Sequence, residues 1–239
     1  MKTILMQIIC YAMALTFSAN AENLKKGNEI FTRDYTATDF DGIVIGNAFK
    51  INIQRGDNFS VKVTGTEQDL KSVAVKVQDN ELQIRIEKEC EFLKFSNEGE
   101  LTVDITMPHL INLDLSGATV STIKGFDEDA INVDVSGASV AKLYINSKKI
   151  NIDVSGASTV QLVGACAELH CEVSGASSFN GYGCEADNVE LDASGASSAK
   201  VFANRKLIAD ASGASSITYK GDAMVEGDSS MASSIKKMN

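Results

Sequence analysis

Residues 131–138 have the sequence Ile-Asn-Val-Asp-Val-Ser-Gly-Ala, and residues 150–157 repeat it as Ile-Asn-Ile-Asp-Val-Ser-Gly-Ala. Its last part, Ser-Gly-Ala, recurs down the second half of the chain, with successive serines 20, 19, 19, 20, 18 and 18 residues apart. A period near twenty residues is typical of a solenoid in which each repeat forms one coil. The phrase serines are Ser116, Ser136, Ser155, Ser174, Ser194, Ser212 and Ser230, the last in the altered phrase Ser230-Met231-Ala232.

The first six repeats have apolar residues one, three and five positions before their serines, and most repeats have another apolar residue seven positions after the serine. This alternation places these side chains on one face of two strands, with the glycine at a tight corner between them. One coil cannot bury its apolar face alone, so the coils must stack, at about 4.8 Å per step. We therefore predict an all-β fold in which residues 109–239 form a parallel β-helix of 18–20 residues per coil.

The first half of the chain follows a different pattern. Residues 22–38 are polar, and we expect a loose entry segment there. Residues 39–108 contain runs such as Phe49, Ile51 and Ile53 that alternate with polar residues, which predicts an N-terminal portion rich in half-buried strands.

Residues 1–21 have the features of a signal peptide. Lys2 precedes an apolar run from Ile4 to Phe17, and Ala19-Asn20-Ala21 fits a cleavage site. A retained membrane anchor is the alternative, but the run is short for a bilayer-spanning helix, and no later stretch is long and apolar enough to cross a membrane. We expect export to the periplasm, the outer-membrane surface or the extracellular space.

The chain carries 22 Lys and Arg against 32 Asp and Glu, a formal charge of −10. A surface this acidic repels phosphate backbones, so we do not expect nucleic acid as a partner. No motif indicates a cofactor, and no Cys/His spacing indicates zinc.

Export makes disulfides chemically accessible to the cysteines that follow the leader. Cys166 lies eleven residues after its phrase serine and Cys184 lies ten after the next one, so the two should occupy neighbouring coils. We predict a disulfide between Cys166 and Cys184 as one outcome, although sequence cannot supply the geometry that a disulfide needs.

Stacking converts each repeat position into a row on the surface. An acidic residue lies two positions before every phrase serine, and we call this row the acidic column. One interpretation is that hydrogen bonds from corner amides or serine hydroxyls offset the repulsion between the carboxylates. A second is a row of weak Ca²⁺ sites, because hard cations bind carboxylate oxygens. The acidic column comprises Asp114, Asp134, Asp153, Glu172, Asp192, Asp210 and Asp228.

Eight positions after the phrase serines lies a row that contains three aromatic residues, Tyr144, Tyr182 and Phe202, together with Lys124, Val163 and Lys220. Aromatic rings that point outward can stack on sugar rings or pack on a protein, so these three form the candidate binding surface. Coverage by the following loops is the alternative. The phrase serines themselves favour a structural ladder, because His109 and His170 are not spaced to act as their bases.

The phrase Phe40-Asp41-Gly42-Ile43, the segment Ile51–Asp57 and the repeated Val-Ser-Gly-Ala-Ser coils together resemble the putative auto-transporter adhesin, head GIN domain family of exported Bacteroidetes-type proteins. The resemblance covers about residues 38–236. It implies a right-handed parallel β-helix with an N-terminal β portion, and an envelope or surface role such as adhesion. It implies no catalytic residues.

Two functions remain open at this point. The first is a non-enzymatic envelope or surface protein that binds a glycan or a protein along the coil face. The second is a polysaccharide lyase or glycosidase, which would need a local break in the repeat with clustered carboxylates. The regularity of the coils favours the first.

Overall fold

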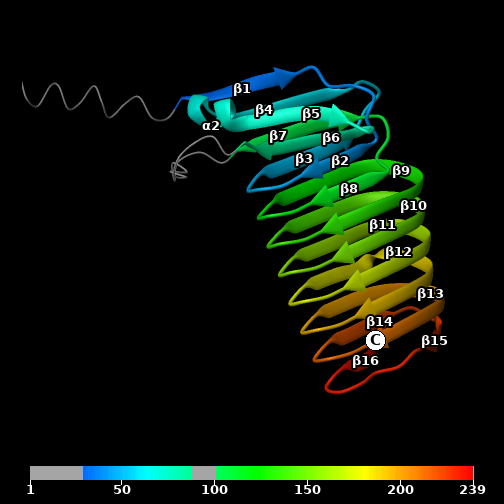
Figure 1. Cartoon of the computed structure of the whole chain (residues 1–239). Coiled ribbons are helices and arrows are strands. Elements are labelled where there is room, and N and C mark those ends of the chain that lie inside the picture. Colours follow the sequence, from blue (N-terminus) through cyan, green and yellow to red (C-terminus); the bar gives the residue numbers. More distant parts are fainter. Residues whose placement is uncertain (1–28, 88–100, 239) are drawn as a thin grey trace, which may run out of the picture.

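The computed structural model describes residues 29–87 and 101–238, which form one column of stacked β-coils (Figure 1). A single sheet of 16 strands runs the length of the column. The predicted all-β solenoid is confirmed. The expected signal peptide lies outside the described residues.

The repeats form coils that pair in parallel through backbone hydrogen bonds. Each long strand holds the residues that follow one corner and bends into the phrase that precedes the next corner. Equivalent repeat positions face each other, as in the pairs Asp134 with Asp153 and Asp153 with Glu172. The strands are β8 (Asn112–Leu115), β9 (Val120–Val135), β10 (Val140–Val154), β11 (Thr159–Val173), β12 (Ser178–Ala193), β13 (Ser198–Ala211), β14 (Ser216–Lys220), β15 (Met224–Glu226) and β16 (Ser234–Lys237).

The phrase glycines form the tight corners. Gly137 has φ +76°, a conformation that L side chains rarely adopt. A Cβ atom built on it would lie 2.4 Å from the carbonyl oxygen of Gly117 in the coil before. That oxygen accepts a hydrogen bond from the amide of Ala138 at 2.7 Å, so the corners are stacked as closely as the strands.

Two kinds of residue fill the interior. The alternating apolar residues form one continuous core along the column. Beside them runs a row of buried hydroxyl residues, three positions after each of the first six phrase serines, which our sequence reasoning missed. The hydroxyl of Ser215 donates to the carbonyl oxygen of Ala193 at 3.0 Å, and that of Ser197 to Val173 at 3.1 Å. These bonds satisfy hydroxyls that would otherwise be costly to bury.

The N-terminal portion continues the same column. β2 (Gly42–Ile45) pairs in parallel with β8, and β3 (Lys50–Arg55) pairs in parallel with β9, so one sheet crosses the expected boundary at residue 108. Asn47, with φ +74°, takes the place of a phrase glycine above Gly117, since its carbonyl oxygen accepts the amide of Ala118. Asn tolerates this conformation better than most residues with a side chain.

Less regular elements complete this end of the column. The antiparallel pairs are β5 with β6, β4 with β7, and β1 with β4. The expectation of a loose segment over residues 22–38 is wrong for its described part, because residues 30–35 form β1 at the sheet edge. The elements are β1 (Ile30–Tyr35), β4 (Ser60–Thr66), the short helix α2 (Glu67–Ser72), β5 (Val73–Gln78), β6 (Glu81–Ile86) and β7 (Thr102–Met107).

Within the described residues, no helix has the length and apolar character needed to traverse a bilayer.

Candidate binding surfaces

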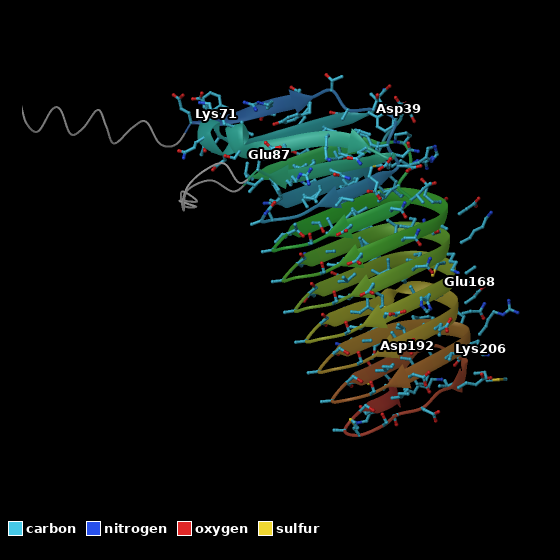
Figure 2. The ribbon with its side chains drawn as sticks, viewed as in Figure 1. Asp39, Lys71, Glu87, Glu168, Asp192 and Lys206 are labelled. Atoms are coloured by element: carbon cyan, nitrogen blue, oxygen red, sulfur yellow. The ribbon has the colours of Figure 1, made fainter. Side chains whose placement is uncertain are left out.

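The acidic column forms as a continuous row on the phrase strands. Backbone pairing places Asp114 beside Asp134, and each later member beside the next as far as Asp210. Asp114 is half-buried below the N-terminal strands, and the others are exposed. Figure 2 shows Asp192 on this side of the column, with Glu168 and Lys206 nearer its margin.

The interpretation that corner amides or serine hydroxyls bond to these carboxylates is wrong. In the described part of the chain, no phrase serine hydroxyl or corner amide donates to the acidic column. One backbone bond does reach it, from the amide of Asp228 to Oδ1 of Asp210 at 3.0 Å. The core and the backbone ladder must therefore offset the repulsion.

Stacking raises the pKa of four carboxyl groups in the acidic column. Burial, and then the charges of Asp114 and Asp153, raise the pKa of Asp134 above its ordinary value. Burial alone raises the pKa of Asp114. Burial followed by the carboxylates of adjacent coils raises the pKa of Asp153 and of Asp192, although His170 partly opposes the shift at Asp192.

Polar side chains form a second row beside the acidic column, four positions before the phrase serines. The amide of Asn132 donates to Asn112 at 2.9 Å, and that of Asn151 donates to Asn132 at 2.7 Å. His170 continues the row and contacts Glu172 and Glu190. Sequence reasoning missed this row, although the repeated Ile-Asn-Val-Asp phrase contains it.

The two rows line a shallow groove that runs up to the N-terminal strands. Its lining includes Val44 and Gln83 together with Asn112, Asp114, Asn132 and Asp134. Amide and carboxylate groups at regular intervals can accept hydrogen bonds from hydroxyl groups or attract cationic groups. In the part of the chain that the structure describes, no three His, Cys, Asp or Glu side chains are grouped closely enough to hold a metal ion. Weak Ca²⁺ binding therefore stays a prediction.

The aromatic row on the other strands is interrupted. Tyr144 pairs with Val163, but the partner of Val163 is Gly183 rather than Tyr182, and Phe202 pairs with Glu185. β12 contains extra residues at this point, so Tyr182 lies at a bulge. The prediction of one continuous aromatic row is therefore wrong in its register.

The three aromatic side chains differ in how much of their surface is exposed to solvent. Tyr144 is 40% exposed, and the Lys124 Nζ atom lies 5.8 Å from its ring centroid. Tyr182 is half-buried, because its hydroxyl donates to Thr218 two coils away at 2.8 Å and Lys220 Nζ lies 5.1 Å from its ring centroid. Phe202 is also half-buried. Tyr144 is thus the aromatic ring with most surface left to bind a ligand.

Neither His109 nor His170 is placed to act as a general base for a phrase serine. The ring of His170 faces Glu172 at 3.5 Å and Glu190 at 3.3 Å, and His109 faces Glu128. Among the described residues, no hydrogen bond joins either histidine to a phrase serine.

Cys166 and Cys184 lie side by side in the interior. Their Sγ atoms are 3.9 Å apart, and both are buried free thiols. The register pairs Cys184 with Gly164 and Cys166 with Ala186, so the two cysteines are diagonal neighbours in adjacent coils. The hydrogen bond between the thiols and their burial raise the pKa of Cys166. The two sulfurs are thus in contact, and a disulfide between Cys166 and Cys184 stays a prediction.

Residues 39–223 match the family model described as putative auto-transporter adhesin, head GIN domain. The chain belongs to this family. A search among curated proteins gives no match.

Solved structures share the fold of this head GIN domain. A putative adhesin from Bacteroides fragilis is 21% identical with a TM-score of 0.79, over 89% of this chain and 99% of the other. A putative adhesin from Parabacteroides distasonis is 15% identical with a TM-score of 0.73, over 89% and 98%. A putative lipid binding protein from the same species is 19% identical with a TM-score of 0.68, over 89% and 98%. At these identities the likeness establishes the fold alone.

Proposed function

We propose that the protein is an exported, non-enzymatic adhesin of the cell envelope or surface, which binds a glycan or a surface protein along the outer faces of its coils. The observation that carries this proposal is the conversion of repeat positions into straight surface rows of amide, carboxylate and lysine side chains. Such rows suit an extended partner that makes the same contact at successive steps, rather than a small molecule enclosed in a pocket.

The family supports the same conclusion. The chain belongs to a family described as putative adhesins, and adhesion requires a surface that engages a partner outside the cell. The predicted signal peptide would bring the protein to that location.

The experiment is a screen of the purified protein against a glycan array and against extracted surface proteins, with detection of any cleaved product. Binding that persists without turnover supports the adhesin. Release of oligosaccharide fragments would contradict it and favour the alternative, a polysaccharide lyase or glycosidase. No binding to glycan or protein would overturn the proposal altogether.

Tyr144→Ala tests the aromatic contact. A ring that stacks on a sugar contributes about 1 kcal/mol, so we expect its loss to weaken binding several-fold. Val77→Ala, an exposed apolar residue on β5 away from this row, is the matched control and should bind as the unmodified protein does.

A further inference from the structure

One face of the column is poor in acidic residues, although the chain as a whole is strongly negative. Glu185, which pairs with Phe202 at the bulge of β12, is an exposed carboxylate on this face. The outward positions four, six and eight residues after the seven phrase serines contain five lysines and no Asp or Glu. The phrase-strand face differs, since it carries the acidic column together with Glu168, Glu190 and Glu226. The lysines are Lys124, Lys142, Lys200, Lys220 and Lys236.

The row at position six is in unbroken register, unlike the interrupted aromatic row. Backbone pairing links each member to the next from β9 through β16. We call it the lysine row, and it comprises Thr122, Lys142, Gln161, Asn180, Lys200, Thr218 and Lys236.

The lysine charges on this face are not neutralised within the protein. Among residues 29–87 and 101–238, no ion pair joins any of the five lysines to a carboxylate. Lys124 and Lys220 contact the rings of Tyr144 and Tyr182 instead. Lys142, Lys200 and Lys236 are exposed. Five cations on one side therefore remain available to an anionic partner.

The spacing within the lysine row indicates what kind of anion fits. Lys142, Lys200 and Lys236 belong to the second, fifth and seventh coils, so steps of about 4.8 Å separate them by about 14 and 10 Å. Gln161, Asn180 and Thr218 fill the intervening positions with hydrogen-bonding groups. The row thus alternates single positive charges with neutral polar groups along a straight line.

We propose that this face binds a linear acidic polysaccharide, whose carboxylate or sulfate groups pair with the lysines while its hydroxyl groups bond to the amide and hydroxyl side chains between them. Tyr144, on the same face, is placed to stack on a sugar ring. This inference rests on the proposed adhesin function and names its ligand class. Double-stranded DNA carries one charge per about 1.7 Å, far denser than the lysine row.

The test measures binding of the purified protein to alginate and chondroitin sulfate, with dextran as the neutral control, at low and physiological salt. We expect both acidic polymers to bind, dextran not to bind, and affinity to fall as salt rises. Because exposed ion pairs each contribute a few-fold, K142A/K200A/K236A should weaken binding roughly 10- to 100-fold. K142R/K200R/K236R, which keeps the charges, should retain most of it.

The matched control changes the same number of charges on the phrase-strand side. K148A/K149A/K206A removes three lysines of the opposite side, two of them paired with Asp129 and Glu226. Its affinity should stay near that of the unmodified protein, and the thermal unfolding of all variants should be similar. An equal loss in K142A/K200A/K236A and in the control would overturn the assignment of the face.

Other outcomes separate this inference from the proposed function. Failure of both acidic polymers to bind, while neutral glycans or a protein bind in a Tyr144-dependent way, overturns the ligand class but leaves the adhesin. Equally tight binding to double-stranded DNA or to phosphatidylglycerol vesicles overturns the assignment to a polysaccharide. An absence of any partner overturns both.

Discussion

At the scale of single residues, the phrase glycines decide whether coils can stack. Gly156 has φ +72°, and a Cβ atom there would lie 2.5 Å from the carbonyl oxygen of Gly137. Gly125 has a similar φ of +84°, but its nearest neighbour would be Cβ of Arg55 at an ordinary 3.6 Å. Comparing substitutions at Gly125 and Gly156 therefore separates the cost of the unfavourable φ from the cost of the steric clash.

We expect Gly125→Ala to lose about 1 kcal/mol of unfolding free energy, because of the unfavourable φ alone. Gly156→Ala should lose clearly more, because two stacked corners must move apart. Urea denaturation monitored by circular dichroism measures both. Equal losses in the two variants would show that corner stacking contributes nothing beyond φ.

The cysteine pair gives a second prediction at this scale. Exchange with a small-molecule disulfide should oxidise the two thiols and join Cys166 to Cys184. The small-molecule disulfide is reduced in this exchange and leaves as two thiol molecules. The sulfurs must approach from 3.9 Å to a bond of about 2 Å, a small shift for side chains that are already in contact.

Closing this loop should stabilise the protein by about 3 kcal/mol relative to the reduced form. Mass spectrometry of a digest under non-reducing conditions detects the cross-linked peptide, and thermal melts with and without reductant measure the gain. Cys171→Ser is unsuitable as a control, because Cys171 is fully buried, so Cys166→Ala is compared under both conditions and should show no reductant effect. Two unmodified thiols after treatment with the small-molecule disulfide would contradict the prediction.

At the scale of strands and rows, the carboxylates of the acidic column repel one another at each step between coils. The raised pKa of Asp134 means that its folded form holds a proton more tightly than the unfolded chain does. Its contribution to stability is therefore favourable below the unfolded-state pKa, about 3.9, and is lost as the pH rises through the folded-state pKa.

Asp134→Asn should accordingly be more stable than the unmodified protein at neutral pH, by up to about 1 kcal/mol once salt screening is included. The difference should shrink as the pH falls below about 4, where both proteins carry a neutral group. Asp127→Asn removes an exposed charge outside the column and is the control. A loss of stability at neutral pH would mean that the carboxylate makes a favourable contact.

Calcium binding is tested on the same row. If carboxylates of the acidic column share Ca²⁺, millimolar Ca²⁺ should raise the melting temperature, and D134N/D153N should remove the effect. Equal concentrations of Mg²⁺ control for screening of repulsion, which any divalent cation provides. An unchanged melting temperature removes the calcium interpretation and leaves the row free for a cationic partner.

At the scale of the whole molecule, the column has two chemically different sides. The phrase strands present carboxylates and amides, and the strands after each corner present lysines, hydroxyls and aromatic rings. A net charge of −10 conceals this division. Partners of opposite charge could therefore bind to different sides of one column.

Function at a surface requires export, which gives the prediction at this scale. Protein recovered from the envelope or the medium should begin at Glu22, since cleavage is expected after Ala21. Intact-mass measurement of that fraction checks it. Retention of residues 1–21 would favour the membrane anchor instead.

The sequence by itself determined the coil, its period, the inward residues and the register of the acidic column. Parallel neighbours in a stack of near-equal coils align through their backbones, so a shared position in the repeat becomes a shared place in space. The family resemblance followed from the same phrases, and the match over residues 39–223 confirms it.

Tertiary structure alone decided where extra residues are accommodated and how the irregular end is built. The repeat from Ser174 is 20 residues long, but its length does not say that the bulge falls at Tyr182 and interrupts the aromatic row. The alternation of apolar and polar residues along single strands also does not predict that β2 and β3 join the column, or that β1 pairs with β4. Those pairings depend on contacts between segments distant in sequence, where no period repeats to reveal the partner.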